Sequence, residues 1–109
     1  MIRKVAVVVG ALALAVPALA QDAAKGKQVY DAAAPKCKVC HAVGGVGNAK
    51  GALEGVGTKL KADEIKAWMR TPKEMTEKTK ATRKPYMKSY TLPKADLDAL
   101  VAYMMSLKK

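Results

Sequence analysis

The sequence has 109 residues, with 20 lysines and arginines against nine aspartates and glutamates, and its formal charge is +11. This length allows one domain at most. Nucleic acid is excluded as a partner, because the basic residues are spread along the chain and are not gathered in a reading helix. Phenylalanine is absent, and the aromatic residues are one tryptophan and four tyrosines. A chain this small therefore lacks the large side chains that usually build a core.

The first 20 residues have the organisation of a secretory signal peptide. Arg3 and Lys4 form its charged region, an apolar stretch follows, and small residues before Gln21 predict cleavage after Ala20. The apolar stretch is shorter than the about 20 residues that span a bilayer, although an uncleaved anchor stays an alternative. We expect a mature domain over residues 21–109 with a formal charge of +9, located in the periplasm and without a transmembrane segment.

Residues 22–34 have the composition of a helix, with Asp22 as a suitable N-cap and Pro35 as its stop. Gly26 lies inside this helix, where glycine costs about 1 kcal/mol relative to alanine. It is either a tolerated surface glycine or the point where another helix approaches closely, with Tyr30 packing one turn later.

Cys37, Cys40 and His41 form a Cys-x-x-Cys-His run, the attachment signature of c-type haem. Two thiols three positions apart can add across the two vinyl groups of a porphyrin and form two thioether bonds. The adjacent imidazole is then held under the iron as its proximal ligand. The sequence therefore predicts one covalently attached haem c, which would also supply the large apolar centre that the side chains do not.

Other uses of these cysteines are less favoured. A thiol–disulfide redox pair leaves His41 without a role. A zinc site needs four ligands, whereas the chain has two cysteines and one histidine. A disulfide across so short a loop is strained and stabilises little.

With this run of residues the sequence resembles the cytochrome c family. The resemblance implies that Gly26 and Tyr30 of the first helix cross the last helix. The family usually has a Gly-Pro-x-Leu segment, whose proline carbonyl accepts a hydrogen bond from the proximal imidazole, whereas this chain has Gly51-Ala52-Leu53. We expect the carbonyl of Ala52 to accept that bond and Leu53 to pack against the porphyrin edge.

Residues 59–71 predict a second helix, which Pro72 ends. Ile65, Trp68 and Met69 follow one face of it. Trp68 is expected in the core, and in some relatives of the resembled family a tryptophan N–H binds a haem propionate.

The second axial ligand of the iron is expected to be a methionine of the irregular segment between Pro72 and the last helix. Met87 shortly follows a proline and precedes the last helix, which is similar to the ligand loop of the family, and Met75 is the alternative. Lys88 stands where relatives often have proline. A thioether ligand favours ferrous iron and raises the potential. The remaining methionines of the mature chain are expected in the core.

Pro93 is expected in the first turn of the last helix, in which Leu97, Leu100, Val101 and Met104 follow one face. On the neighbouring face lies Tyr103, which looks like the family aromatic that meets the first helix.

The sequence thus predicts a small all-α, cytochrome c-like fold with three principal helices around one haem. We expect a monomeric carrier of single electrons between respiratory or dehydrogenase partners, and not an enzyme. The alternatives are a cytochrome subunit of a periplasmic enzyme complex and a haem protein with an openable sixth site for ligand binding or peroxidase-like chemistry. The positive charge favours acidic redox partners, docked near Lys38, Lys84 and Lys88.

Overall fold

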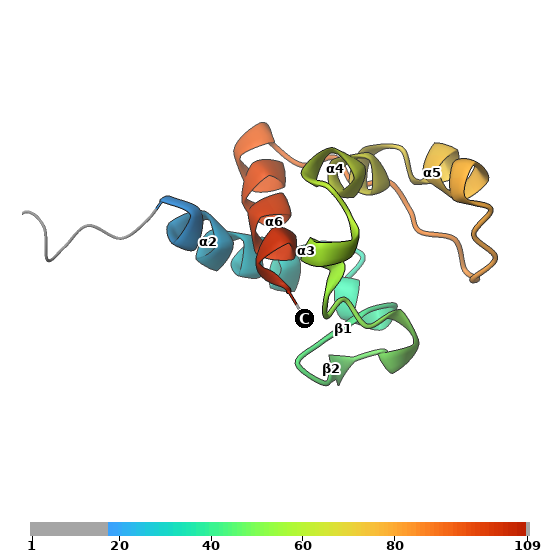
Figure 1. The fold of residues 1–109 in the computed structure, drawn as a ribbon, viewed down its shortest axis with the longest axis horizontal. Helices are drawn as coiled ribbons and strands as arrows, with labels where there is room; N and C mark the ends of the chain where they lie inside the picture. Colours follow the sequence, from blue (N-terminus) through green and yellow to red (C-terminus); the bar gives the residue numbers. More distant parts are fainter. Residues whose placement is uncertain (1–17, 109) are drawn as a thin grey trace, which may run out of the picture.

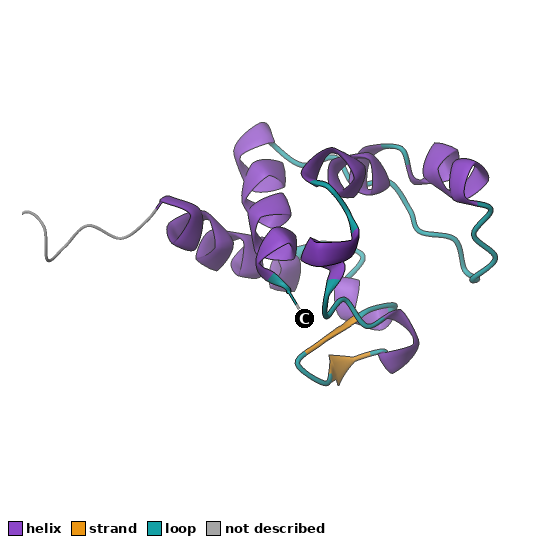
Figure 2. Cartoon of the chain, in the orientation of Figure 1, coloured by secondary structure: helices purple, strands orange, loops and turns teal. Residues whose placement is uncertain are grey.

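Helices make up most of the fold in the computed structural model, which describes residues 18–108 (Figures 1 and 2). The predicted all-α fold is confirmed, and its three principal helices are α2, α4 and α6. The elements in chain order are helix α2 (Ala18–Ala32), a 3-10 turn (Cys37–Val39), strands β1 (Ala42–Val43) and β2 (Val46–Gly47), a second 3-10 turn (Ala49–Gly51), and helices α3 (Val56–Lys59), α4 (Ala62–Arg70), α5 (Pro72–Thr79) and α6 (Lys94–Ser106).

The first and last helices, α2 and α6, cross closely (Figure 1). Gly26 sits at the crossing, where an added Cβ would collide with the carbonyl oxygen of Ala99 and lie 2.6 Å from Cβ of Tyr103. The rings of Tyr30 and Tyr103 pack beside it, with centroids 5.8 Å apart and planes tilted by 60°. The glycine is therefore a close-approach residue, and the predicted contact between the two helices is confirmed.

The core lies where α4 and α2 pack on α6. Leu97 and Leu100 of α6 are 2% and 1% exposed, and Ile65 and Met69 of α4 are buried against them. The short helix α3 joins the same core at the end of α6, where the N–H of Gly57 donates to the carbonyl of Leu107 at 3.0 Å. Burial of these apolar side chains stabilises the scaffold on which the site described below is built.

The boundaries of the first helix differ from the predicted ones. Helix α2 begins at Ala18, so Asp22 lies inside it and is not its N-cap, because the preceding alanines and leucine are strong helix formers. The helix ends at Ala32, before Pro35. It spans the predicted cleavage point after Ala20, and the remainder of the predicted signal peptide lies outside the described residues.

The second predicted helix, residues 59–71, corresponds to α4, which begins later than predicted, at Ala62. The start is delayed because Leu60 and Lys61, between α3 and α4, have extended backbones, and the side chain of Glu64 accepts the N–H of Lys61 at 3.0 Å. Helix α4 ends at Arg70, which confirms the predicted stop at Pro72, but Pro72 also begins the next helix. It occupies the first position of α5, where its missing N–H costs no hydrogen bond.

The segment after Pro72, predicted to be irregular, therefore begins with a helix. Beyond α5, residues 80–93 form a strap without helix or strand that leads back to α6. Pro93 is the N-cap of α6 and is not in its first turn as predicted. No helix of residues 18–108 has both the length and the apolar character needed to cross a bilayer.

Candidate functional site

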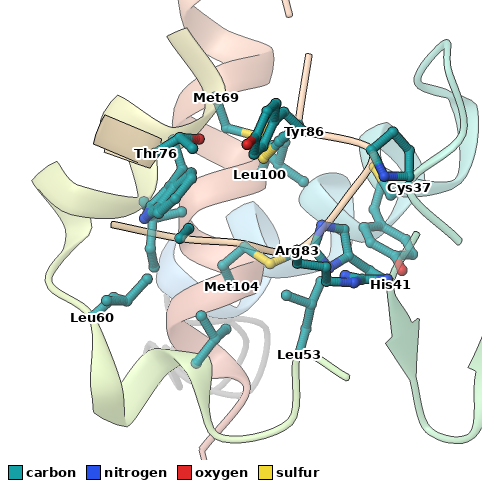
Figure 3. Close-up of a pocket in the computed structure, with 17 residues that line it drawn as sticks. Cys37, His41, Leu53, Leu60, Met69, Thr76, Arg83, Tyr86, Leu100 and Met104 are labelled. Atoms are coloured by element: carbon teal, nitrogen blue, oxygen red, sulfur yellow. The ribbon is translucent and has the colours of Figure 1, made fainter. Parts of the chain in front are cut away.

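A cavity of about 280 Å³ opens between the Cys37–His41 turn, helix α4, the strap and helix α6 (Figure 3). Its walls are mainly aliphatic and aromatic. The residues that line it are Tyr30, Cys37, His41, Leu53, Val56, Leu60, Ile65, Trp68, Met69, Thr76, Ala81, Arg83, Pro85, Tyr86, Met87, Leu100 and Met104. An apolar space of this kind, with a thiol and an imidazole at one side, is suited to a large flat apolar group.

A tight turn brings the two cysteines and the histidine together. The N–H groups of Cys40 and His41 both donate to the carbonyl of Cys37, at 3.1 and 2.8 Å. Cys37 and His41 line the cavity, and Cys40 is half-buried beside it. Both cysteines carry free thiols, and burial raises the pKa of the Cys37 thiol. The turn thus presents two free sulfurs and one imidazole from a single short segment.

The hydrogen bond to the imidazole differs from the expected one. His41 Nδ1 lies 2.9 Å from the carbonyl oxygen of Gly51, not from that of Ala52. The 3-10 turn Ala49–Gly51 explains the difference: Asn48 caps this turn by accepting the N–H of Lys50 at 3.0 Å, and the turn aims the Gly51 carbonyl at the ring. An N–H at Nδ1 satisfies that carbonyl, which leaves the lone pair of Nε2 free to bind a metal.

The environment of His41 favours its neutral form. Burial lowers the pKa of the imidazole, the nearby positive charge of Arg83 lowers it further, and the Gly51 hydrogen bond acts in the opposite direction. Neutral imidazole is the form that coordinates iron.

The structure separates the two candidate methionine ligands. Met87, on the strap, lines the same cavity as His41. Met75 is buried within α5 and does not line it. Met69 and Met104 also reach the cavity, but both are helical residues of the buried core, as predicted. Of the two candidates, Met87 therefore shares a site with His41.

The two expected contact residues, Leu53 and Trp68, both line the cavity. Leu53 is fixed there by its backbone, because its N–H donates to the carbonyl of Ala42 at 2.8 Å. Trp68 was expected in the core, but it lies on α4 half-buried at the wall of the cavity and is not part of the buried core. Its proposed bond to a propionate stays a prediction.

Two features of the cavity residues were not anticipated from the sequence. The buried hydroxyl of Tyr30 has no hydrogen-bond partner among the described residues, and burial raises its pKa to about 12. Arg83 donates from Nη2 to the carbonyl of Cys40 at 2.5 Å, across 43 positions of sequence. A family aromatic was expected at Tyr30, but neither the orphaned hydroxyl nor the long-range contact has a local signal in the sequence.

The residues present fit a covalently bound haem. One thiol and the imidazole of the turn line an apolar cavity that the side chains leave unfilled, and the second thiol belongs to the same turn. Tyr30, whose buried hydroxyl has no partner among the described residues, lines the cavity as well. Cys37 and Cys40 have the spacing for two thioether bonds, and His41 has a free Nε2 for the iron. Among the side chains that the structure describes, no three His, Cys, Asp or Glu residues cluster as a metal site of their own.

The sequence matches the family model described as cytochrome c over residues 23–108. No curated protein and no solved structure was found to match. The family match extends over the cysteine turn, the cavity, the strap and α6, and it agrees with the mainly helical fold. The chain therefore belongs to the cytochrome c family, as a haem c electron-transfer protein.

Proposed function

We propose that this protein is a periplasmic carrier of single electrons, in which His41 and Met87 are the two axial ligands of the haem iron. The observation that carries the proposal is that both residues line one apolar cavity, although one belongs to the cysteine turn and the other to the strap. Bound haem c supplies a one-electron couple between ferric and ferrous iron. The chain has to anchor that group, set its preference between the two states and exclude other ligands.

Anchoring belongs to the cysteine turn. Cys37 and Cys40 would form the thioethers, so the group would stay attached even when the fold opens. The Gly51 carbonyl, 2.9 Å from Nδ1 of His41, holds the imidazole in one tautomer and orientation. This support comes from backbone and is insensitive to most side-chain substitutions.

The second ligand sets the preference between oxidation states. A neutral thioether from Met87 favours the ferrous iron and raises the potential. If His41 and Met87 both hold the iron, dioxygen and peroxide would find no open site. This arrangement favours a carrier over a haem protein that binds ligands or reduces peroxide.

The location follows from the predicted signal peptide. Cleavage after Ala20 would release residues 21–109 into the periplasm, where attachment of haem c in bacteria takes place according to the family resemblance. The two thiols have to stay reduced in that oxidising compartment until they react.

We propose acidic redox partners, such as a respiratory oxidase, a reductase or a dehydrogenase. Lys38, Lys84 and Lys88 are exposed, and none of them takes part in an ion pair with a described carboxylate. Lys38 belongs to the cysteine turn, and the other two belong to the strap. Their unpaired charges would steer an acidic surface toward the cavity.

Carbon monoxide binding tests the closed iron site. It binds only ferrous haem with a free or displaceable sixth position, so the reduced wild-type protein at neutral pH is expected not to bind it. Met87→Ala is expected to bind it, whereas Met75→Ala, the matched control, is expected to behave as wild type. Uptake of carbon monoxide by the folded wild-type protein would contradict the carrier and favour the ligand-binding alternative.

A further inference from the structure

Two side chains tie the strap to the segment that contains the haem-attachment residues. Arg83 Nη2 donates to the carbonyl of Cys40 at 2.5 Å, and the hydroxyl of Tyr90 donates to the carbonyl of Pro35 at 2.5 Å. Met87 lies between these two strap residues. The strap is therefore joined on one side of Met87 to Cys40 of the cysteine turn, and on the other side to Pro35, just before that turn.

Arg83 is the donor to the Cys40 carbonyl among the described residues. No backbone N–H of the described residues donates to it, so the guanidinium supplies its hydrogen bond. Arg83 in turn forms no ion pair with any described carboxylate. Arg83 therefore donates a charge-assisted hydrogen bond to the Cys40 carbonyl, which has no backbone donor among the described residues.

Gly51 makes room for this contact. A Cβ on Gly51 would collide with both the Cys40 carbonyl oxygen and Nη1 of Arg83. The same glycine offers its own carbonyl to Nδ1 of His41. Figure 3 shows the Arg83 and His41 side chains next to each other at one side of the cavity. One junction therefore touches the support of the proximal ligand and the strap of the distal one.

We propose that Arg83 is a clasp: by holding the Cys40 carbonyl it keeps the strap closed and Met87 on the iron. This inference depends on the proposed function, because it takes Met87 as the sixth ligand. Arg83 is a positioning residue, since it acts through Met87. The clasp supplies the rigidity that a proline would give at position 88, where this chain has lysine.

The experiment measures how easily imidazole displaces the sixth ligand of the mature, haem-loaded ferric protein at neutral pH. Three variants are compared with wild type. Arg83→Gln removes the positive charge and the guanidinium donors, whereas Arg83→Lys keeps the charge and one donor group. The third variant is Arg70→Gln. Arg70 is the matched control, because it is exposed at the end of α4 and does not line the cavity. A near-infrared spectrum of the wild-type protein is also recorded, because the thioether-to-iron band shows whether a methionine is bound to the iron.

Arg83→Gln is expected to bind imidazole about fivefold more tightly than wild type, since a solvent-exposed hydrogen bond contributes a modest amount to the closed state. The imidazole affinity of Arg83→Lys is expected to lie between those of Arg83→Gln and wild type. The imidazole affinity of Arg70→Gln is expected to equal that of wild type. Hydrogen exchange of the amides of residues 81–92 is expected to accelerate in Arg83→Gln, while that of α2 and α6 stays unchanged.

Equal imidazole affinity in wild type and Arg83→Gln would overturn the clasp, and so would an equal increase in Arg70→Gln, because net charge would then be responsible. Faster exchange throughout α2 and α6 would also overturn it, since the arginine would then stabilise the whole fold. A thioether band in wild type together with any of these results leaves the Met87 assignment intact. A wild-type spectrum without that band overturns the ligand assignment and the clasp with it.

Discussion

Replacing Gly26 by alanine tests the closest helix contact of the fold. In an exposed helix interior this change stabilises by about 1 kcal/mol. Here the added Cβ would collide with the carbonyl of Ala99, which belongs to the backbone of α6 and cannot rotate away, and would lie 2.6 Å from Cβ of Tyr103. Overpacking of a core lowers the free energy of unfolding by up to about 3 kcal/mol in the usual range. The net result is a loss of about 2 kcal/mol in the free energy of unfolding.

The assay is guanidinium denaturation of the haem-loaded protein, followed by far-ultraviolet circular dichroism. Gln28 provides the matched control, because it is exposed in the middle of α2. The difference between Gln28→Gly and Gln28→Ala measures the helix propensity alone and is expected to favour alanine by about 1 kcal/mol. Gly26→Ala is expected to lower the free energy of unfolding, the opposite of the effect of alanine at position 28. A Gly26→Ala protein as stable as wild type or more stable would refute the close crossing of α2 and α6.

Two further predictions concern charge and pH. The rate of electron transfer to an acidic partner is expected to fall as salt concentration rises, and Lys88→Gln should weaken this dependence more than Lys108→Gln; a rate that is flat across ionic strength would remove the steering argument. Burial raises the pKa values of Tyr30 and Tyr90 to about 12, above the value of about 10 for an unfolded chain. The folded state therefore keeps these protons longer, so their contribution to stability is complete below about pH 10 and is lost as the pH rises toward about 12. Denaturation at several alkaline pH values should show this loss, and it should be smaller in a Tyr30→Phe, Tyr90→Phe double variant; an identical loss in that variant would contradict it.

Local signals were sufficient to predict the features that depend on neighbouring residues. The Cys37–His41 turn is recognisable because haem attachment needs its residue types within five positions. Gly26 was predictable as a contact point because glycine inside a helix has a cost that close packing can offset. The apolar face of Ile65, Trp68 and Met69 predicted where α4 packs.

Features that depend on distant residues or on turn geometry were not predictable in this way. The donor to the Cys40 carbonyl lies 43 positions away, and no periodicity marks it. The bond from His41 to Gly51, and not to Ala52, is set by the 3-10 turn that Asn48 caps. Pro72 was expected to end a helix, and α4 does end at Arg70, but helix α5 that begins at Pro72 was not predicted, because a proline suits both places.

Near-infrared absorption of the ferric protein tests the central claim most directly, namely that His41 and Met87 close the iron site from both sides of the cavity. The wild-type protein is expected to show a thioether-to-iron charge-transfer band, Met75→Ala is expected to keep it, and Met87→Ala is expected to lose it. A band that survives in Met87→Ala, or that disappears in Met75→Ala while the protein stays folded, would contradict the account.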